Sequence, residues 1–141
     1  MADRQKAIDT LRREQCSLVV ANGGSTAIFR RRGVRDLFDI LAKEPALLRG
    51  AFVADKVVGK GAAALMVEGG VSGLYAGVIS RPALQMLRRA GVSVSFGLCV
   101  PNIINRGGTD ICPVERLCGP CLTAAECLPL IRQFVNNQTS K

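Results

Sequence analysis

Residues Ala51–Pro82 read AFVADKVVGKGAAALMVEGGVSGLYAGVISRP, and this stretch decides the fold that we predict for the chain. Small and apolar residues in its first half recur at the spacing of one helix face, namely Ala54, Val57, Val58, Gly61, Ala62, Leu65 and Met66. The pattern predicts a helix that opens near Val53. Gly69-Gly70 should end it, because glycine accepts the left-handed conformation of a helix C-cap.

A strand and a second helix follow in the same stretch. The short apolar run 74–79 is typical of a strand that is buried on both faces of a sheet. Ser80 can then cap a helix, and Pro82 falls in its first turn, where the missing N–H costs little. A helix–strand–helix unit of this kind indicates a layered α/β fold.

The rest of the chain adds a hairpin, further helices and a further strand. Apolar runs on both sides of Asn22-Gly23-Gly24-Ser25 favour a β-hairpin. Alternation predicts a strand at 92–96, and Ile103-Ile104 can extend the sheet at its edge before a loop at 105–110. Helical spacing predicts helices at 3–15, 34–41 and 83–90.

The chain should therefore form an α/β sandwich, with a mixed central sheet flanked by helices. We divide it into an N-terminal surface helix (1–16), an α/β domain (17–111) and a cysteine-rich segment (112–141) that packs on the same domain. A last helix begins either at Thr123, which has capping-box spacing with Glu126, or at Pro129.

Composition limits the classes of function. The 141 residues are 48% hydrophobic, carry a formal net charge of +8 and include no histidine. The apolar runs are too short to span a bilayer, and the charged N-terminus lacks the apolar region of a signal peptide, so we expect a cytoplasmic protein with no membrane partner. Dispersed basic residues, one Tyr, five Phe and no Trp provide little surface for stacking bases, which disfavours nucleic acid as a partner.

Several runs carry a resemblance to a known family. The order of elements and the run beginning Val53-Ala54-Asp55-Lys56 resemble the cytidine-deaminase-like superfamily. More closely, ADKVVGKGAAALMVEGG, LYAGVIS, and INR followed by CPVE are similar to a bacterial domain-of-unknown-function family assigned to that fold. The resemblance covers about residues 17–115. It implies a cytidine-deaminase-like three-layer sandwich, and it brings no established activity with it.

The deaminase zinc motifs are absent where the resemblance would place them. Deaminases hold zinc with a His or Cys at the start of the central helix and with Pro-Cys-x-x-Cys after the next strand, and a Glu moves protons. This chain has Val53 at the first ligand position and Asp55 at the Glu. Pro82 matches the proline, but Ala83 and Met86 replace the cysteines. We therefore expect a protein without zinc-dependent deaminase activity.

The same segment has residues that suit an anionic ligand. On the predicted helix, Lys56 and Lys60 are four residues apart and would lie on one face, next to Asp55. A helix N-terminus with two ammonium groups can hold a phosphate or a nucleotide-like small molecule. In an enzyme, Asp55, Lys56 and Cys112 would be the catalytic candidates and Lys60 would bind the ligand. The alternative is that Asp55 complements the helix dipole and the lysines are solvated.

The strongest chemical signal is a cysteine cluster near the C-terminus. Cys112, Cys118, Cys121 and Cys127 have the spacing C-x5-C-x2-C-x5-C. Four thiolates within sixteen residues can hold a [4Fe–4S] cluster or a zinc ion. The spacing resembles the iron–sulfur loop of endonuclease III-type DNA glycosylases, which implies cluster ligation here and not DNA repair.

Two alternatives stay open for these cysteines. Cys118-Gly-Pro-Cys121 has the sequence of the thioredoxin active site, which favours dithiol redox chemistry. Otherwise the thiols pack as small apolar side chains, as we expect for Cys16 and Cys99.

Three functions follow from these features. The first is a binding or regulatory protein on a degenerate deaminase scaffold, with a cysteine-bound metal or iron–sulfur centre. The others are an enzyme acting on a nucleotide-like ligand and a dithiol redox protein. By analogy with deaminase-like folds, a homo-oligomer is expected.

Overall fold

The computed structural model describes residues 2–31, 34–104, 108 and 110–139. The side chains of residues 2, 138 and 139 lie outside this description, and so does most of the predicted loop 105–110. The helices are α1 (Ala2–Arg13), α2 (Arg35–Lys43), α3 (Pro45–Leu48), α4 (Lys60–Gly69), α5 (Arg81–Arg89), α6 (Pro113–Cys118) and α7 (Ala124–Thr139). The strands are β1 (Leu18–Asn22), β2 (Ser25–Phe29), β3 (Phe52–Val58), β4 (Gly73–Ser80) and β5 (Ser93–Val100).

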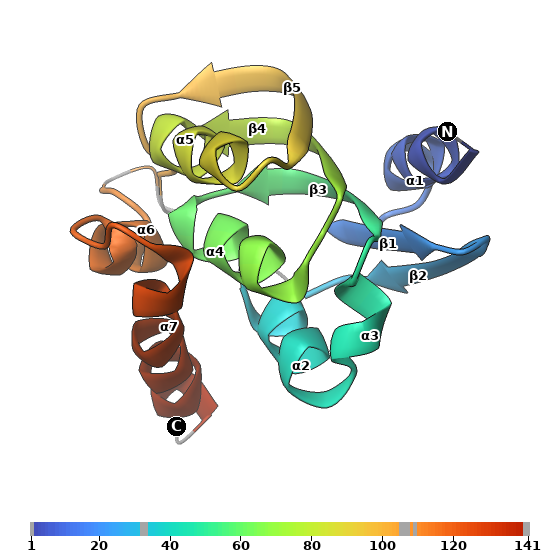
Figure 1. The fold of residues 1–141 in the computed structure, drawn as a ribbon. Helices are drawn as coiled ribbons and strands as arrows, with labels where there is room; N and C mark the ends of the chain where they lie inside the picture. Colours follow the sequence, from blue (N-terminus) through green and yellow to red (C-terminus); the bar gives the residue numbers. More distant parts are fainter. Residues whose placement is uncertain (1, 32–33, 105–107, 109, 140–141) are drawn as a thin grey trace.

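The strands form a mixed five-stranded sheet in the order β2-β1-β3-β4-β5 (Figure 1). β1 runs antiparallel to β2 and to β3, whereas β3, β4 and β5 are parallel. The predicted hairpin is confirmed: Gly23 and Gly24 have φ of 59° and 89°, the left-handed values that a tight two-residue turn needs. The parallel half of the sheet places the carboxyl ends of β3, β4 and β5 at one edge.

Helices cover both faces of the sheet. The main core lies between the sheet and α2–α7, with α4 packed against α2, α5, α6 and α7. On the opposite face, α1 buries Ala7 and Leu11 against Val19, Ala21 and Ala54. The predicted surface helix is therefore the cover of a second, smaller core. The mixed α/β sheet with flanking helices is confirmed.

The first half of the predicted central helix is a strand. Residues 52–58 form β3, which pairs with β1 on one side and β4 on the other, and α4 begins only at Lys60 after the N-cap Gly59. The apolar pattern led to the wrong prediction because a strand buried on both faces is also continuously apolar. A short apolar run therefore fits the period of a helix as well as that of a strand. The valine pair 57–58 favours a strand, since β-branched side chains fit a pleated sheet.

Other boundaries agree with the sequence. Gly70 has φ of 78° and caps α4, and the hydroxyl of Ser80 accepts the N–H of Ala83 at the start of α5. The capping box is confirmed, because Thr123 Oγ1 accepts the N–H of Glu126 and the Glu126 carboxylate accepts the N–H of Thr123. The last helix thus begins at Ala124, and the alternative start at Pro129 is wrong because Pro129 lies inside it. Ile104 forms an isolated bridge with Ile111.

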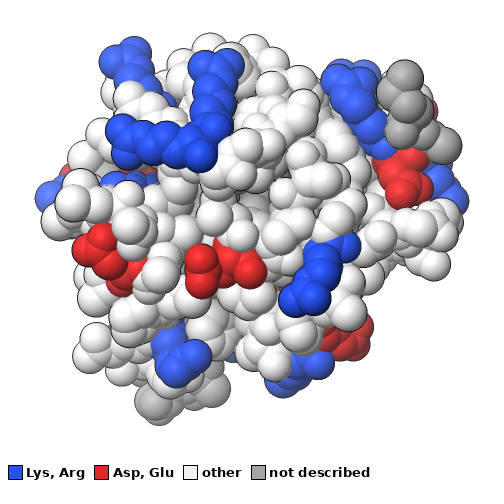
Figure 2. All heavy atoms as spheres, viewed as in Figure 1, with Lys and Arg blue, Asp and Glu red and all other residues white. Residues whose placement is uncertain are grey.

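The surface in Figure 2 shows how the charges are distributed. Lys and Arg side chains on this face stand in separate groups, with Asp and Glu between them. The net charge of +8 is thus not gathered into one basic stripe on the face shown. Among the described helices, none is both long and apolar enough to cross a bilayer.

Candidate functional site

A buried carboxylate, Glu115, connects α6 to the carboxyl edge of the parallel strands. Only 3% of this residue is exposed. Its Oε1 accepts the backbone N–H of Lys60 at 2.7 Å and the hydroxyl of Ser80 at 3.0 Å, and its Oε2 accepts the N–H of Ile103. Open α/β sheets bind ligands in the crevice outside the carboxyl ends of their strands. In this protein Glu115 lies at that edge, where it joins Ser80 at the end of β4 to Lys60 at the start of α4.

Lys60 extends from the same point toward the cysteine-rich segment. Its Nζ donates to the carbonyl oxygens of Gly119 and Cys121, at 2.9 and 2.6 Å, and the residue is buried. The backbone N–H of Lys60 therefore holds α6 through Glu115, while its side chain holds the turn that follows α6. One residue at the start of α4 thus positions both ends of the Glu115–Cys121 segment.

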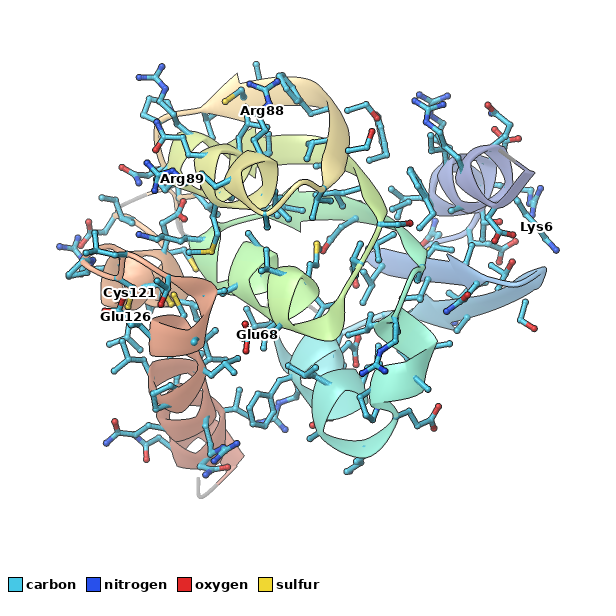
Figure 3. The ribbon with its side chains drawn as sticks, in the orientation of Figure 1. Lys6, Glu68, Arg88, Arg89, Cys121 and Glu126 are labelled. Carbon is cyan, nitrogen blue, oxygen red and sulfur yellow. The ribbon has the colours of Figure 1, made fainter. Side chains whose placement is uncertain are left out.

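Three of the cysteines lie together beside this lysine, where α6 meets α7. Cys127 lies close enough to Cys118 and Cys121 to perturb the pKa of both thiols, and its own Sγ donates to the carbonyl oxygen of Thr123 at 3.6 Å. A backbone bond of 3.0 Å from the N–H of Cys121 to the carbonyl of Cys118 closes the turn between them. Figure 3 shows Cys121 next to Glu126 at this junction. Cys118 and Cys127 are fully buried, and Cys121 is 9% exposed.

The surroundings give the three thiols different acidities. The hydrogen bond from Cys127 is the largest influence on Cys118 and lowers its pKa below 9.0, in spite of burial. Burial raises the pKa of Cys121, and its hydrogen bond to Cys127 adds to the rise. The hydrogen bond to Cys118 raises the pKa of Cys127. Of these three thiols, Cys118 alone has a lowered pKa. Cys118 is therefore the thiol most readily deprotonated.

Cys112 is apart from these three. It is the N-cap residue of α6, whereas Cys118 is the last residue of that helix. At 1.5 Å of rise per residue, the two positions are about 9 Å apart along the helix axis. Among the residues that the structure describes, no group of three or more His, Cys, Asp or Glu side chains is placed to hold a metal ion.

The residues expected at a helix opening lie elsewhere. Asp55 and Lys56 belong to β3, so Lys56 and Lys60 do not share a helix face, and the predicted pair of ammonium groups is wrong. Lys56 is exposed, whereas Lys60 is buried against carbonyl groups. Asp55 is buried in the strand, and that burial raises its pKa to about 7.

The comparison with the deaminase zinc motif also changes. Val53 and Asp55 lie in β3, so the residues that open the central helix are Gly59, Lys60 and Gly61. Ala83 lies in the first turn of α5 and Met86 just past its middle, and both are buried. The placement of the motif on Val53 failed because the helix was predicted to begin too early.

Sequence reasoning did not identify the role of Glu115. In the sequence it stands out only as the last residue of the run CPVE, between Val114 and Arg116, yet it binds groups from three separate segments. Burial of such a carboxylate requires hydrogen-bond donors.

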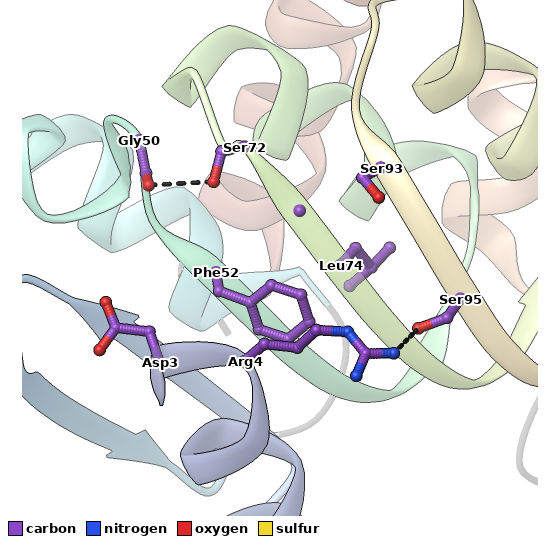
Figure 4. A pocket seen from close by; sticks show the side chains of 9 residues that line it. Asp3, Arg4, Gly50, Phe52, Ser72, Leu74, Ser93 and Ser95 are labelled. Atoms are coloured by element: carbon purple, nitrogen blue, oxygen red, sulfur yellow. Dashed lines mark hydrogen bonds between the residues drawn. The ribbon is translucent and has the colours of Figure 1, made fainter. Parts of the chain in front are cut away.

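Two hollows lie outside this site. The first is a groove of about 550 Å³ at the carboxyl edge of the sheet, lined mainly by apolar side chains from Val57, Val78, Val100, Pro101, Ile103, Ile104 and Ile111. The second, of about 360 Å³, lies at the opposite ends of β3, β4 and β5 (Figure 4). There the guanidinium of Arg4 stands 6.0 Å from the centre of the Phe52 ring and donates to Ser95 Oγ.

The fold and the site define the class: a mixed α/β protein in which a glutamate, a lysine and a thiol cluster meet at the carboxyl edge of the sheet. The chain belongs to the family described as TM1506: Domain of unknown function (DUF1893), whose model matches residues 6–135. The solved structure of a DUF1893 family protein (TM1506) from Thermotoga maritima is similar. It has 25% sequence identity and a TM-score of 0.86, over 94% of this chain and 89% of that one. A search of curated proteins found no significant match.

Proposed function

We propose that this DUF1893 protein is a binding or regulatory protein whose chemical centre is a dithiol, formed by Cys118 with Cys127 as its partner. The observation that carries the proposal is the cluster of buried thiols at the junction of α6 and α7, where Cys127 lies close enough to Cys118 to lower its pKa. A thiolate is the nucleophile in thiol–disulfide exchange, and a second thiol beside it completes the reaction. We also infer, from the family resemblance and the strand order, that the fold is deaminase-like.

The reaction would proceed in two exchanges with a low-molecular-weight disulfide. The Cys118 thiolate attacks one sulfur of the disulfide, a protein–reagent disulfide forms, and the other half leaves as a thiolate that takes up a proton. Cys127 then loses its proton and attacks the Cys118 sulfur, which releases the second half as a thiol. Two protein thiols are oxidised, and one small disulfide is reduced to two thiols.

The residues around the thiol cluster support this chemistry. The ammonium of Lys60 acts on all three thiols in the direction that lowers their pKa values. Its bonds to the carbonyls of Gly119 and Cys121 hold the turn between the cysteines. In thioredoxins the CGPC sequence follows a strand and opens a helix, whereas here its first cysteine is the last residue of α6. We therefore assign Cys127, which lies beside Cys118, as its partner in place of Cys121.

Non-reducing peptide mapping after treatment with oxidised glutathione tests the proposal. We expect the wild-type protein to lose two free thiols, to form a Cys118–Cys127 disulfide, and to recover both thiols after reduction. Cys118→Ser and Cys127→Ser should each abolish this disulfide. Because Cys118 is buried, the reaction should be slow and should accelerate in mild denaturant.

Cys99→Ser is the matched control, since Cys99 is only partly buried and belongs to β5. It should oxidise like the wild type. Oxidation that is spread over Cys16, Cys99 and Cys112, or that persists unchanged in Cys118→Ser, would contradict the proposal.

A cysteine-bound metal is the second candidate, because three of the four cysteines in the C-x5-C-x2-C-x5-C pattern already lie side by side. A [4Fe–4S] cluster or a zinc ion would need Cys112 to approach them from the other end of α6. Anaerobic purification followed by metal and sulfide analysis separates the two candidates. Stoichiometric iron and sulfide, or zinc, that is lost in Cys112→Ser would favour the metal centre over the dithiol.

A further inference from the structure

The hollow at the amino ends of β3, β4 and β5 (the amino-edge hollow) lies at the other end of the parallel strands from Glu115. It has a volume of about 360 Å³. Small-molecule sites in proteins begin at about 300 Å³, so the hollow has room for a small ligand. Its lining is largely polar and includes the hydroxyl groups of Ser72, Ser93 and Ser95 beside the ring of Phe52.

Two opposite charges from the first turn of α1 stand in this hollow without a charged partner. Asp3 and Arg4 both line it, and none of the ion pairs among the described side chains involves either residue. In Figure 4 the two side chains point apart, with the Arg4 guanidinium toward Ser95 and the Asp3 carboxylate on the other side of Phe52. A guanidinium has several N–H donors, and the bond from Arg4 to Ser95 Oγ is long, at 3.4 Å. The hollow therefore offers an anion-binding group and a cation-binding group at separate places.

Hydrogen bonds hold the wall of the hollow in place before any ligand enters. The Ser72 hydroxyl donates to the carbonyl oxygen of Gly50 at 3.0 Å, and the N–H of Ser93 donates to the carbonyl oxygen of Ser72 at 3.2 Å (Figure 4). These two bonds connect the segments that lead into β3, β4 and β5. The Arg4 guanidinium is placed over the Phe52 ring, 6.0 Å from its centre. A preformed site loses little conformational freedom on binding, which favours a small ligand.

We propose that the amino-edge hollow binds a free α-amino acid. The Arg4 guanidinium and the Ser95 hydroxyl bind the carboxylate of the ligand, and the Asp3 carboxylate binds its ammonium group. Charge selects this class of ligand. A simple anion would be repelled by Asp3 and a simple cation by Arg4, whereas a zwitterion gains a charge-assisted hydrogen bond at each place. The Phe52 ring provides an apolar surface for the side chain of the ligand.

Titration of the wild-type protein with each common amino acid, followed by the NMR shifts of backbone amides, tests the proposal. We expect at least one amino acid to cause saturable shifts at Ser72, Ser93 and Ser95. Its carboxamide and its N-acetyl derivative should each bind at least about tenfold more weakly, because each lacks one of the two charges. The absence of saturable shifts with every amino acid would overturn the proposal. Equal binding of the N-acetyl derivative would also overturn it, since the hollow would then be a plain anion site.

Two variants assign the two charges. Asp3→Asn should weaken binding of the amino acid by about tenfold and leave binding of its N-acetyl derivative no weaker, because the repulsion of the carboxylate is removed. Arg4→Met should weaken binding of the amino acid by a similar factor and leave binding of its carboxamide no weaker. Unchanged affinity for the amino acid in both variants would contradict the assignment.

The matched controls are Asp9→Asn and Arg12→Met on the same helix. Neither residue lines the hollow, and Arg12 also stands over an aromatic ring, 5.7 Å from the centre of Tyr75. Both controls should bind the amino acid as the wild type does. Cys118→Ser should do so as well, because the site is independent of the proposed dithiol. A loss in Arg12→Met as large as that in Arg4→Met would place the ligand outside the amino-edge hollow.

Discussion

Replacement of Glu115 with alanine is expected to lower the free energy of unfolding by about 3–5 kcal/mol, the usual range when one partner of a buried charged network is removed. The carboxylate accepts from the N–H of Lys60, the hydroxyl of Ser80 and the N–H of Ile103. Without it, these three donors lose their acceptor, and two of them, the N–H of Lys60 and the hydroxyl of Ser80, are buried. Urea denaturation measures the change, with the dependence of the free energy of unfolding on urea concentration fitted as one shared slope for all variants.

Glu115→Gln should lower the free energy of unfolding less than Glu115→Ala does, because its amide oxygen keeps one acceptor in place while the charge is removed. The matched control is Glu68→Ala on α4, where the glutamate is exposed (Figure 3). Its effect should stay within about 0.5 kcal/mol. Equal stabilities for Glu115→Ala and Glu68→Ala would show that Glu115 does not hold α6 to the sheet.

The second large effect concerns pH and Asp55. Burial is the main cause that raises the pKa of this carboxyl from 3.8 to about 7, and the charge of Asp36 also raises it. Between these two values the folded protein holds a proton that the unfolded chain has lost. Stability therefore falls as pH rises from about 4 to about 7, and above 7 the loss is complete, at ~4 kcal/mol.

Asp55→Asn removes this titration. The variant keeps an oxygen where Oδ1 accepts the N–H of Val57, and it carries no charge at any pH. We expect it to be more stable than the wild type at pH 8 and nearly equal at pH 4. Asp9→Asn, the same change at an exposed position in α1, should retain the full pH dependence. Thermal unfolding of the three proteins at pH 4 and pH 8 measures the effect. A wild type with the same stability at both pH values would contradict this account.

Much of the fold follows from local signals in the sequence. The paired glycines 23–24, the C-cap Gly70 and the N-cap Ser80 mark element ends through backbone chemistry that does not depend on the rest of the chain. At 52–58 the sequence predicted a helix and the structure has a strand, because this element depends on contacts with the rest of the chain. Strand β3 forms because β1 and β4 pair with it on both sides, and a pattern of apolar residues does not record which partners are present.

The site was predictable only in part for a similar reason. The structure brings Cys118, Cys121 and Cys127 together near the C-terminus, whereas the metal site predicted for these three with Cys112 stays a prediction. The contacts that surround them depend on tertiary structure: the bonds of Lys60 to Gly119 and Cys121 span about sixty residues of sequence. No local pattern couples residues so far apart. The raised pKa of Asp55 likewise follows from its burial in β3, which the sequence did not predict.

Thiolate absorbance in the ultraviolet, followed against pH, tests the central claim most directly. The account predicts that one thiol of the native protein ionises at a lower pH than an unperturbed cysteine, and that Cys118→Ala removes this transition. Identical titrations of the wild type and Cys118→Ala would contradict the claim that contact with Cys127 makes Cys118 the acidic thiol of the cluster.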